Sequence, residues 1–297
     1  MAKKRQMVQP LISVIIGFYN EHLYLREAIE SVLNQSYTHW ELFLADDGSS
    51  DGSTEIAKSY AQRNPGRIFY LEHPQHANKG VCATRNLALK QARGEFIALL
   101  DGDDVWLPRK LLQQVDTFAR YPDAAMLCEA SSYWYTWKDR EQFDVTVPVG
   151  AGQDRLHQPP SLIHVLYPLG KGAAPCPSGL MIRRDVMLQE GGFEENFTGP
   201  YQMYEDQAYL CKIYLHHPVY ITSACNNLYR QRQGSLVRWV TDEGRYHKVR
   251  KFFLEWLQQY LKRQRINDPA IHRLLRKALL PYRYPFLRYI KRLLSNG

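Results

Sequence analysis

The sequence of 297 residues contains no long apolar run and few cysteines. A helix that crosses a bilayer needs roughly 20 consecutive apolar residues, and no stretch approaches that length. The basic first ten residues lead straight into a short strand-like run, which is not the pattern of a secretion signal. The five cysteines are odd in number and widely spaced, so they indicate neither a disulfide framework nor a zinc site. We therefore expect a cytoplasmic protein.

Two common nucleotide-binding motifs are absent as well. The sequence has no GxGxxG segment, and its Gly- and Ser-rich stretch DDGSSDGST lacks the lysine of a P-loop. These absences argue against a dinucleotide-dependent oxidoreductase and against a P-loop ATPase.

Acidic residues are scarce at the end of the chain. Residues 245–297 contain 14 Lys and Arg against two acidic residues, whereas residues 1–244 contain 24 basic and 28 acidic residues. The net charge of +8 therefore belongs to the C-terminal region, and the rest of the protein is net negative. This distribution argues against nucleic acid as a partner.

Strand-like apolar runs alternate with helical patterns over the first 120 residues. The runs lie at residues 12–18, 41–45, 68–71 and 95–100. Such alternation predicts βαβ units, and therefore an α/β fold with a mainly parallel sheet flanked by helices. Residues 140–178 contain six prolines and four glycines without a long periodic segment, which predicts surface loops.

Acidic and aromatic residues follow three of these predicted strands. The segments are Phe18 to Glu21, Asp46 to Ser49 and Asp101 to Asp104. Ligands of parallel α/β sheets bind beyond the carboxyl ends of the strands, so these side chains are expected at one edge. Grouped carboxylates repel each other unless a cation lies among them, and carboxylate oxygens suit a hard divalent metal. The alternative is a set of solvated turns and helix caps.

Two aromatic segments allow more than one interpretation. Tyr133, Tyr135 and Trp137 share a face of a predicted strand, which could bind an acceptor sugar or simply pack within the sheet. Phe252, Phe253, Trp256 and Tyr260 form an apolar stripe in the basic region. That region could pack on the rest of the protein as a helical bundle or lie on an anionic membrane surface.

Several segments together resemble family 2 glycosyltransferases of the GT-A fold. In chain order they are SVIIGFYNE, LREAIESVLNQSY, FLADDGSSDGS, ATRN, GEFIALLDGDDVWLP, CPSGLMIRRDVMLQEGGF and YED. The resemblance runs from about residue 11 to about residue 235, in the order and spacing of that family. It implies a GT-A domain over residues 8–235, followed by a basic amphipathic helical region over residues 245–297.

The resemblance implies which residues bind a nucleotide-diphosphate sugar donor. Asp47 matches the position that binds the base. Phe18, Tyr19 and Glu21 belong to the neighbouring loop, where the Tyr19 ring could stack on that base or could be a packing residue. Arg85 matches an Arg-Asn pair beside the donor site.

The resemblance also implies the catalytic groups. Asp101 and Asp103 match a DxD motif, in which the first aspartate faces the ribose and the second binds Mn²⁺ or Mg²⁺. Asp206 matches the general base, and the adjacent Glu205 is the competing candidate. Arg232 stands where many members carry a histidine; a guanidinium cannot ligate a metal, so this side chain contacts the diphosphate or is an ordinary surface arginine.

The function implied is a metal-dependent, inverting transfer of a sugar to a hydroxyl of a glycan or lipid-linked acceptor. One alternative is a sugar-nucleotide nucleotidyltransferase, although its Gly-rich first loop is absent here. Another is a non-catalytic protein that binds membrane surfaces on a transferase scaffold. We expect no nucleic-acid partner, and a cytoplasmic location with peripheral membrane contact through the C-terminal region as an option.

Overall fold

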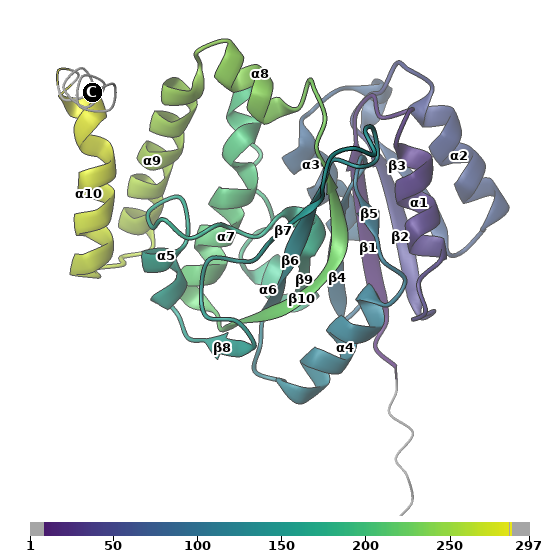
Figure 1. Ribbon diagram of the computed structural model, residues 1–297, viewed down its shortest axis with the longest axis horizontal. Helices are drawn as coiled ribbons and strands as arrows, with labels where there is room; N and C mark the ends of the chain where they lie inside the picture. The colour runs from purple at the N-terminus through teal and green to yellow at the C-terminus, as the bar shows by residue number, and fades with distance from the viewer. Residues whose placement is uncertain (1–8, 285, 287–297) are drawn as a thin grey trace, which may run out of the picture.

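A ten-stranded sheet runs through the centre of the protein, and helices cover both of its faces (Figure 1). The computed structural model describes residues 9–284 and residue 286. The strand order is β3-β2-β1-β4-β9-β6-β10-β5, with β7 beside β6 and β8 beside β10. The predicted α/β class is therefore confirmed.

The first part of the sheet is parallel. β1 pairs with β2 and with β4, and β2 pairs with β3, all in parallel. Helices cover both faces, so β1 and β2 are almost entirely buried, as their continuous apolar runs predicted. The elements are β1 (Ile12–Phe18), α1 (Leu25–Leu33), β2 (Trp40–Asp46), α2 (Ser53–Arg63), β3 (Ile68–Glu72), η1 (Pro74–His76), α3 (Val81–Gln91) and β4 (Phe96–Asp101).

The second part of the sheet is mixed. β9 is antiparallel to β4 and to β6, whereas β10 is parallel to β6. The direction of β9 could not be read from the sequence, because no long periodic segment precedes it. The elements are β5 (Val105–Trp106), α4 (Lys110–Arg120), β6 (Met126–Trp134), β7 (Val145–Val147), β8 (Arg155–His157), α5 (Ser161–Val165), η2 (Pro177–Gly179), β9 (Leu180–Arg183), α6 (Arg184–Gln189), η3 (Gly199–Tyr204), α7 (Glu205–His216) and β10 (Val219–Arg230).

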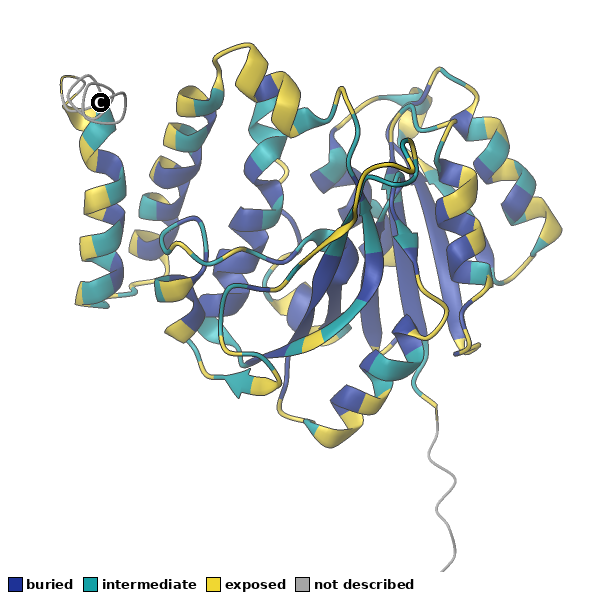
Figure 2. Ribbon diagram, viewed as in Figure 1, coloured by how far each residue is buried: buried dark blue, intermediate teal, exposed yellow. Residues whose placement is uncertain are grey.

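Two hydrophobic clusters lie on opposite faces of the sheet. In β1, Ile15 belongs to one cluster, and Ile12, Val14 and Ile16 belong to the other. Neighbouring side chains of a strand point to opposite faces, which explains this division. Figure 2 shows the buried strands in the centre and exposed residues along the outer faces of the helices.

The C-terminal helices extend the cluster that contains Ile15. They are α8 (Leu236–Asp242), α9 (Tyr246–Arg263) and α10 (Pro269–Arg283). Phe253, Trp256 and Tyr260 are buried in it, and Trp256 meets Phe197 edge-on at a centroid distance of 5.5 Å. The aromatic stripe of α9 therefore packs on the protein and is not available to a lipid surface.

α10 begins after an N-cap residue, Asp268, whose carboxylate accepts hydrogen bonds from the backbone N–H groups of Ala270 and Ile271. A proline usually ends a helix, but Pro281 lies inside the last turn of α10. No helix among residues 9–284 is both long and apolar enough to cross a bilayer. Residues 285 and 287–297 of the predicted basic region, and residue 8 of the predicted GT-A domain, lie outside the described residues, and the boundary between the two regions stays a prediction.

Candidate active site

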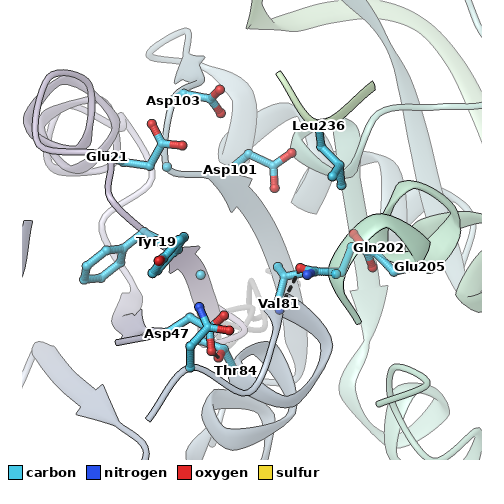
Figure 3. Close-up of a pocket in the computed structure, with 15 residues that line it drawn as sticks. Tyr19, Glu21, Asp47, Val81, Thr84, Asp101, Asp103, Gln202, Glu205 and Leu236 are labelled. Atoms are coloured by element: carbon cyan, nitrogen blue, oxygen red, sulfur yellow. Dashed lines mark hydrogen bonds between the residues drawn. The ribbon is translucent and has the colours of Figure 1, made fainter. Parts of the chain in front are cut away.

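A pocket of about 570 Å³ opens at the edge of the sheet where β1, β2 and β4 end (Figure 3). Its wall contains most of the site residues expected from the sequence, namely Phe18, Tyr19, Glu21, Asp47, Asp101 and Asp103. Arg85 and Arg232 do not line the pocket, but each contacts carboxylates that do. Asp206 lies beside it, in the first turn of α7.

The loop after β1 places Tyr19 at the pocket mouth. Asn20 has a positive φ of 56°, so the chain turns sharply directly after the strand. Phe18 is buried, whereas 49% of the Tyr19 side chain is exposed. The Tyr19 ring is therefore accessible for stacking, and Figure 3 places it on the same side of the pocket as Asp47.

Asp47 anchors the loop that leads into α3. Its carboxylate accepts hydrogen bonds from the backbone N–H of Lys79 at 2.7 Å and of Gly80 at 3.0 Å, and from the Thr84 hydroxyl at 3.0 Å. Gly48 has a φ of +80°, and a Cβ there would lie 2.6 Å from the His76 carbonyl oxygen. Only glycine fits this crossing of two loops, which fixes Asp47 against the pocket wall.

The neighbouring Asp46 has a different role. Its Oδ1 accepts a hydrogen bond from the Ser49 backbone N–H, and its Oδ2 accepts one from the Thr54 hydroxyl. Asp46 is fully buried and stabilises the turn. Of the two aspartates at the end of β2, Asp47 thus faces the pocket and Asp46 holds the loop.

Arg85 links the DxD motif to α7. One guanidinium nitrogen donates to Asp101 Oδ1 at 2.6 Å, and another donates to Glu205 Oε1 at 2.5 Å. Only 5% of the Arg85 side chain is exposed. Burial raises the pKa of Glu205 to about 7, although the Arg85 charge opposes that rise. The second oxygen, Glu205 Oε2, is buried without a hydrogen-bond partner, so this carboxylate is only half satisfied.

Arg232 forms a second bridge between carboxylates. Its Nε donates to Asp103 Oδ2 at 2.6 Å, and a terminal guanidinium nitrogen donates to Glu21 Oε1. Burial, and then the nearby Asp103 charge, raise the pKa of Glu21 to about 8. Arg232 is therefore placed as the counter-ion of the DxD motif, rather than as an isolated surface arginine.

The carboxylates at this edge fit a divalent cation that takes part of its ligands from another molecule. Glu21, Asp101 and Asp103 approach one another in Figure 3, and Glu21 Oε2 is buried without a hydrogen-bond partner. Carboxylate oxygens are the ligands that Mg²⁺ and Mn²⁺ prefer. Within the described part of the chain, no group of three or more His, Cys, Asp or Glu residues could hold a metal ion by itself. The donor set thus suits a shared site and not a closed protein cage.

Glu205 and Asp206 lie differently at the start of α7. Glu205 lines the pocket, whereas Asp206 is half-buried and accepts a hydrogen bond from the Gln207 backbone N–H at 2.6 Å. Adjacent helical residues point in different directions, which separates the two carboxylates. Burial raises the pKa of Asp206 to about 6.

Sequence reasoning missed part of the pocket wall. Gln202 in η3 accepts a hydrogen bond from the Val81 backbone N–H at 3.2 Å, and Leu236 at the start of α8 completes the far side. Residues 195–203 carry no periodic pattern, so η3 left no sequence signal. Ser235 before an apolar pair was a usable signal for α8, and its hydroxyl accepts a hydrogen bond from the Arg238 backbone N–H.

The aromatic segment after β6 packs within the protein. The rings of Trp134 and Trp137 lie 4.4 and 4.9 Å from the Arg230 guanidinium, and Tyr133 meets Tyr229 edge-on. Arg230 is buried and ion-paired with Glu27. The prediction of one strand face was wrong beyond Trp134, where β6 ends, because Tyr135 and Trp137 lie in the turn that follows. Tyr133 and Trp137 nevertheless make packing contacts with other side chains, as the second interpretation expected.

Known proteins share both the sequence pattern and the fold. A family model described as glycosyl transferase family 2 matches residues 13–188. A putative glycosyltransferase EpsE of Bacillus subtilis (strain 168) is 47% identical over 106 residues, which are 36% of this chain and 37% of that protein. The uncharacterized glycosyltransferase RP339 of Rickettsia prowazekii (strain Madrid E) is 28% identical over 222 residues, or 74% of this chain and 65% of that protein. The chain thus matches less than two thirds of the length of these relatives.

Two solved structures resemble the fold along most of the chain. S. aureus TarS 1–349 in complex with UDP-GlcNAc has a TM-score of 0.56 and 20% identity, and the match covers 90% of this chain and 79% of that one. The mannosyltransferase PcManGT from Pyrobaculum calidifontis, in complex with GDP-Man and Mn²⁺, has a TM-score of 0.60 and 18% identity, with 98% and 76% covered. These likenesses confirm the GT-A type of fold. Because the family model also spans more than half of the sequence, this chain belongs to glycosyltransferase family 2.

Proposed function

We propose that this protein transfers a sugar from a nucleotide-diphosphate donor to an acceptor hydroxyl, with inversion at the anomeric carbon. The observation that carries the proposal is the pocket at the strand ends. It gathers a base-side carboxylate, Asp47, the DxD carboxylates Asp101 and Asp103, and Glu205 of the YED segment in one cavity. Together with a base for the acceptor hydroxyl, this set provides for a single displacement, which needs no covalent nucleophile.

The donor would enter with its base between Tyr19 and Asp47. Tyr19 offers an exposed ring for stacking, and Asp47 Oδ2 carries one hydrogen bond, from Gly80, which leaves capacity to accept another from a base. The diphosphate would then lie toward Asp101 and Asp103. TarS and PcManGT, the structural neighbours, are in complex with UDP-GlcNAc and GDP-Man, which supports a nucleotide-sugar donor without identifying the base.

Asp103 would hold Mn²⁺ or Mg²⁺, with Glu21 and Asp101 beside it. A divalent cation bound there supplies Lewis-acid stabilisation of the charge that the leaving diphosphate gains. Arg232 bridges Asp103 and Glu21, so its guanidinium is also within reach of a diphosphate at this position. Arg85 holds Asp101 from the opposite side and fixes its orientation.

Asp206 would take the proton from the acceptor hydroxyl. A hydroxyl is a poor nucleophile until a base removes its proton, and a base with a raised pKa does this well near neutral pH. Glu205 is the competing base, but its ion pair with the nearly buried Arg85 directs it to the donor side. We therefore assign proton abstraction to Asp206 and the positioning of Arg85 to Glu205.

The acceptor would be a glycan or a lipid-linked sugar that approaches from the α7 side. In this proposal residues 8–235 form the GT-A domain, and residues 245–297 form a basic helical region that supports it. The protein would act in the cytoplasm, with any membrane contact peripheral.

A donor panel tests the function. The full chain is incubated with individual UDP-, GDP-, CDP- and TDP-sugars and Mn²⁺, with and without crude glycan or lipid-linked acceptors, and the nucleotide product is identified. Release of a nucleoside diphosphate supports a glycosyltransferase. In a parallel incubation with added pyrophosphate, formation of a nucleoside triphosphate and a sugar 1-phosphate points to a nucleotidyltransferase, and neither nucleotide product with any donor supports the binding-protein alternative.

The matched pair for this assay is Asp103→Asn and Asp123→Asn. Asp123 is an exposed aspartate in the turn before β6, far from the pocket lining. Loss of product in the first variant and not in the second links the activity to the DxD motif.

A further inference from the structure

Exposed apolar side chains are concentrated at one end of the protein. Among the described residues, twelve large apolar side chains are exposed. Six of them lie in segments that directly follow β1, β6 and β10: Tyr19, Leu23, Phe143, Val145, Val237 and Trp239. Singly scattered apolar residues are normal on a protein surface, but a concentration of this kind marks an interaction site.

The strand directions place these three segments at the same edge. β1 and β4 are parallel and end at the pocket. β9 is antiparallel to both β4 and β6, so β6 runs in the direction of β4, and β10 is parallel to β6. The segments after β1, β6 and β10 therefore lie at the same edge of the sheet as the pocket, and Tyr19 and Leu236 from two of them line it. We call this end of the molecule the pocket edge.

The end of α10 returns to the pocket edge. α9 leads away from α8, and α10 runs back beside it, as the hydrogen-bond distance of 3.3 Å between His247 Nδ1 and the Tyr282 hydroxyl indicates. Tyr284 and Phe286 follow, and their side chains are 51% and 60% exposed. Figure 1 shows α8 and the end of α10 at the same end of the molecule, and Figure 2 shows exposed residues on both.

The opposite edge differs from the pocket edge. Arg183, the last residue of β9, pairs with Phe96 at the start of β4, so α6 begins at the amino ends of the parallel strands. Leu188 is the one exposed large apolar residue of that helix. Eight of the twelve exposed apolar side chains thus belong to the pocket edge.

Basic residues accompany this apolar edge. Arg238 on α8, Arg245 at the N-cap of α9, Lys248 on α9 and Arg283 at the end of α10 are exposed. The acidic Asp242 and Glu243 are exposed beside them, and Glu243 is ion-paired with Arg245, so the four basic residues outnumber the acidic ones by two. Residues 245–297 contain 14 basic and two acidic residues in all. Exposed aromatic and aliphatic side chains flanked by Lys and Arg are typical of surfaces that enter the headgroup region of anionic membranes.

We propose that the pocket edge docks on an anionic membrane surface, through Phe143, Val237, Trp239, Tyr284 and Phe286, with the basic helical hairpin beside them. Docked in this way, the pocket mouth opens toward the lipid headgroups. This orientation would present the active site to an acceptor sugar carried on a lipid, a step that rests on the proposed transferase function. The surface differs from the aromatic stripe of α9, which is buried.

Vesicle co-sedimentation of the full chain tests the docking. The probes are vesicles of equal parts phosphatidylcholine and phosphatidylglycerol, compared with phosphatidylcholine alone. The double variant Val237→Glu, Trp239→Glu is compared with Leu188→Glu, an equally exposed apolar residue at the opposite edge. We expect binding to the anionic vesicles only, a partition coefficient lowered about tenfold by the double variant, and no change for Leu188→Glu.

Phe143→Glu provides a second variant on a separate loop, and thermal unfolding confirms that all variants are folded. Equal partition of the double variant and Leu188→Glu, or no binding by the unaltered chain, overturns the docking. A dimer that the double variant converts to a monomer, measured by light scattering, also overturns it in favour of self-association. Donor hydrolysis is measured in parallel. If the protein binds the vesicles but hydrolyses none of the donors, the docking proposal stands and the proposed transferase function is rejected.

Discussion

The two parts of the sheet contribute different groups to the pocket. The parallel part, from β1 to β4, supplies Asp47, Asp101 and Asp103 from the ends of regular strands. The mixed part, with α7 and the loop after β10, supplies two other groups. Glu205 lines the pocket and pairs with Arg85 of the first part, and Arg232 pairs with Glu21 and Asp103 without lining the pocket. In the proposed function this difference would become a division of roles, in which the parallel part binds the donor and metal and the mixed part controls the transfer.

The largest effect is expected in the parallel part. Asp103→Asn removes a carboxylate charge from the proposed metal site, and we expect turnover to fall about 10³-fold, the scale of losing one preorganised electrostatic contact. Excess chelator should produce a similar loss in the unaltered protein. Initial rates of nucleoside diphosphate release measure both effects, and full turnover in chelator would remove the metal from the mechanism.

The mixed part is tested by Asp206→Asn. The side chain keeps its shape but cannot accept the acceptor proton, so we expect turnover to fall about 10²-fold while the donor dissociation constant stays nearly unchanged. Calorimetric titration with the donor measures this dissociation constant. A loss of donor binding would contradict the division between the two parts of the sheet. Glu205→Gln is the matched comparison, because it should disturb Arg85 and therefore weaken donor binding as well.

The same two parts differ in how far the sequence predicts them. β1, β2 and β4 are buried apolar runs bounded by turn residues, so their ends, and with them Asp47 and Asp103, could be located from the sequence. β9 and η3 could not, because neither the four-residue strand nor the irregular 3-10 segment stands out as a buried apolar run between turn residues, and their positions depend on tertiary contacts.

The ion pairs of the site were also beyond sequence reasoning. Arg85 and Glu205 are 120 residues apart, and Arg232 and Glu21 are 211 apart. Local patterns carry no information on contacts at such separation. The resemblance to a known family pointed to Arg85 and to Arg232. It did not identify the carboxylates with which these arginines pair.

The pH dependence sharpens the assignment within α7. Burial raises the pKa of Asp206 to about 6, and a general base works only when it is deprotonated. Turnover should therefore rise with pH through about 6 and fall about tenfold for each unit below it. The rate at saturating donor, measured from pH 4.5 to 8, tests this. If Asp206→Asn retains the same inflection, then another group is responsible for it.

A smaller effect is expected from a change in α9, which packs against the mixed part through Arg250. The Arg250 guanidinium donates to the hydroxyls of Tyr167 at 3.0 Å and Tyr204 at 3.2 Å, and Tyr204 directly precedes Glu205. Arg250→Ala should leave these hydroxyls without their charged donor, shift the start of α7, and lower turnover about fivefold with donor affinity unchanged. Lys251→Ala, on the exposed face of the same helix, is the control. Equal rates in the two variants would mean that α9 stabilises the fold without positioning the site.

The smallest effect is expected from Arg232, the residue at which the two parts meet. Its guanidinium bonds Asp103 Oδ2 at 2.6 Å, so in the absence of donor it competes with a divalent cation for that oxygen. The pair is partly exposed, and such pairs contribute up to about 1 kcal/mol, which corresponds to a factor of about five or less in affinity. Arg232→Ala should therefore bind Mn²⁺ about threefold more tightly than the unaltered chain when no donor is present, a difference that electron paramagnetic resonance titration of free Mn²⁺ resolves. With donor present the advantage should disappear, because the diphosphate then gains a cation from Arg232 that the variant lacks. Weaker Mn²⁺ binding by the variant in the absence of donor would show instead that Arg232 orients Asp103 for the metal, and the two parts of the sheet would then be coupled before the donor arrives.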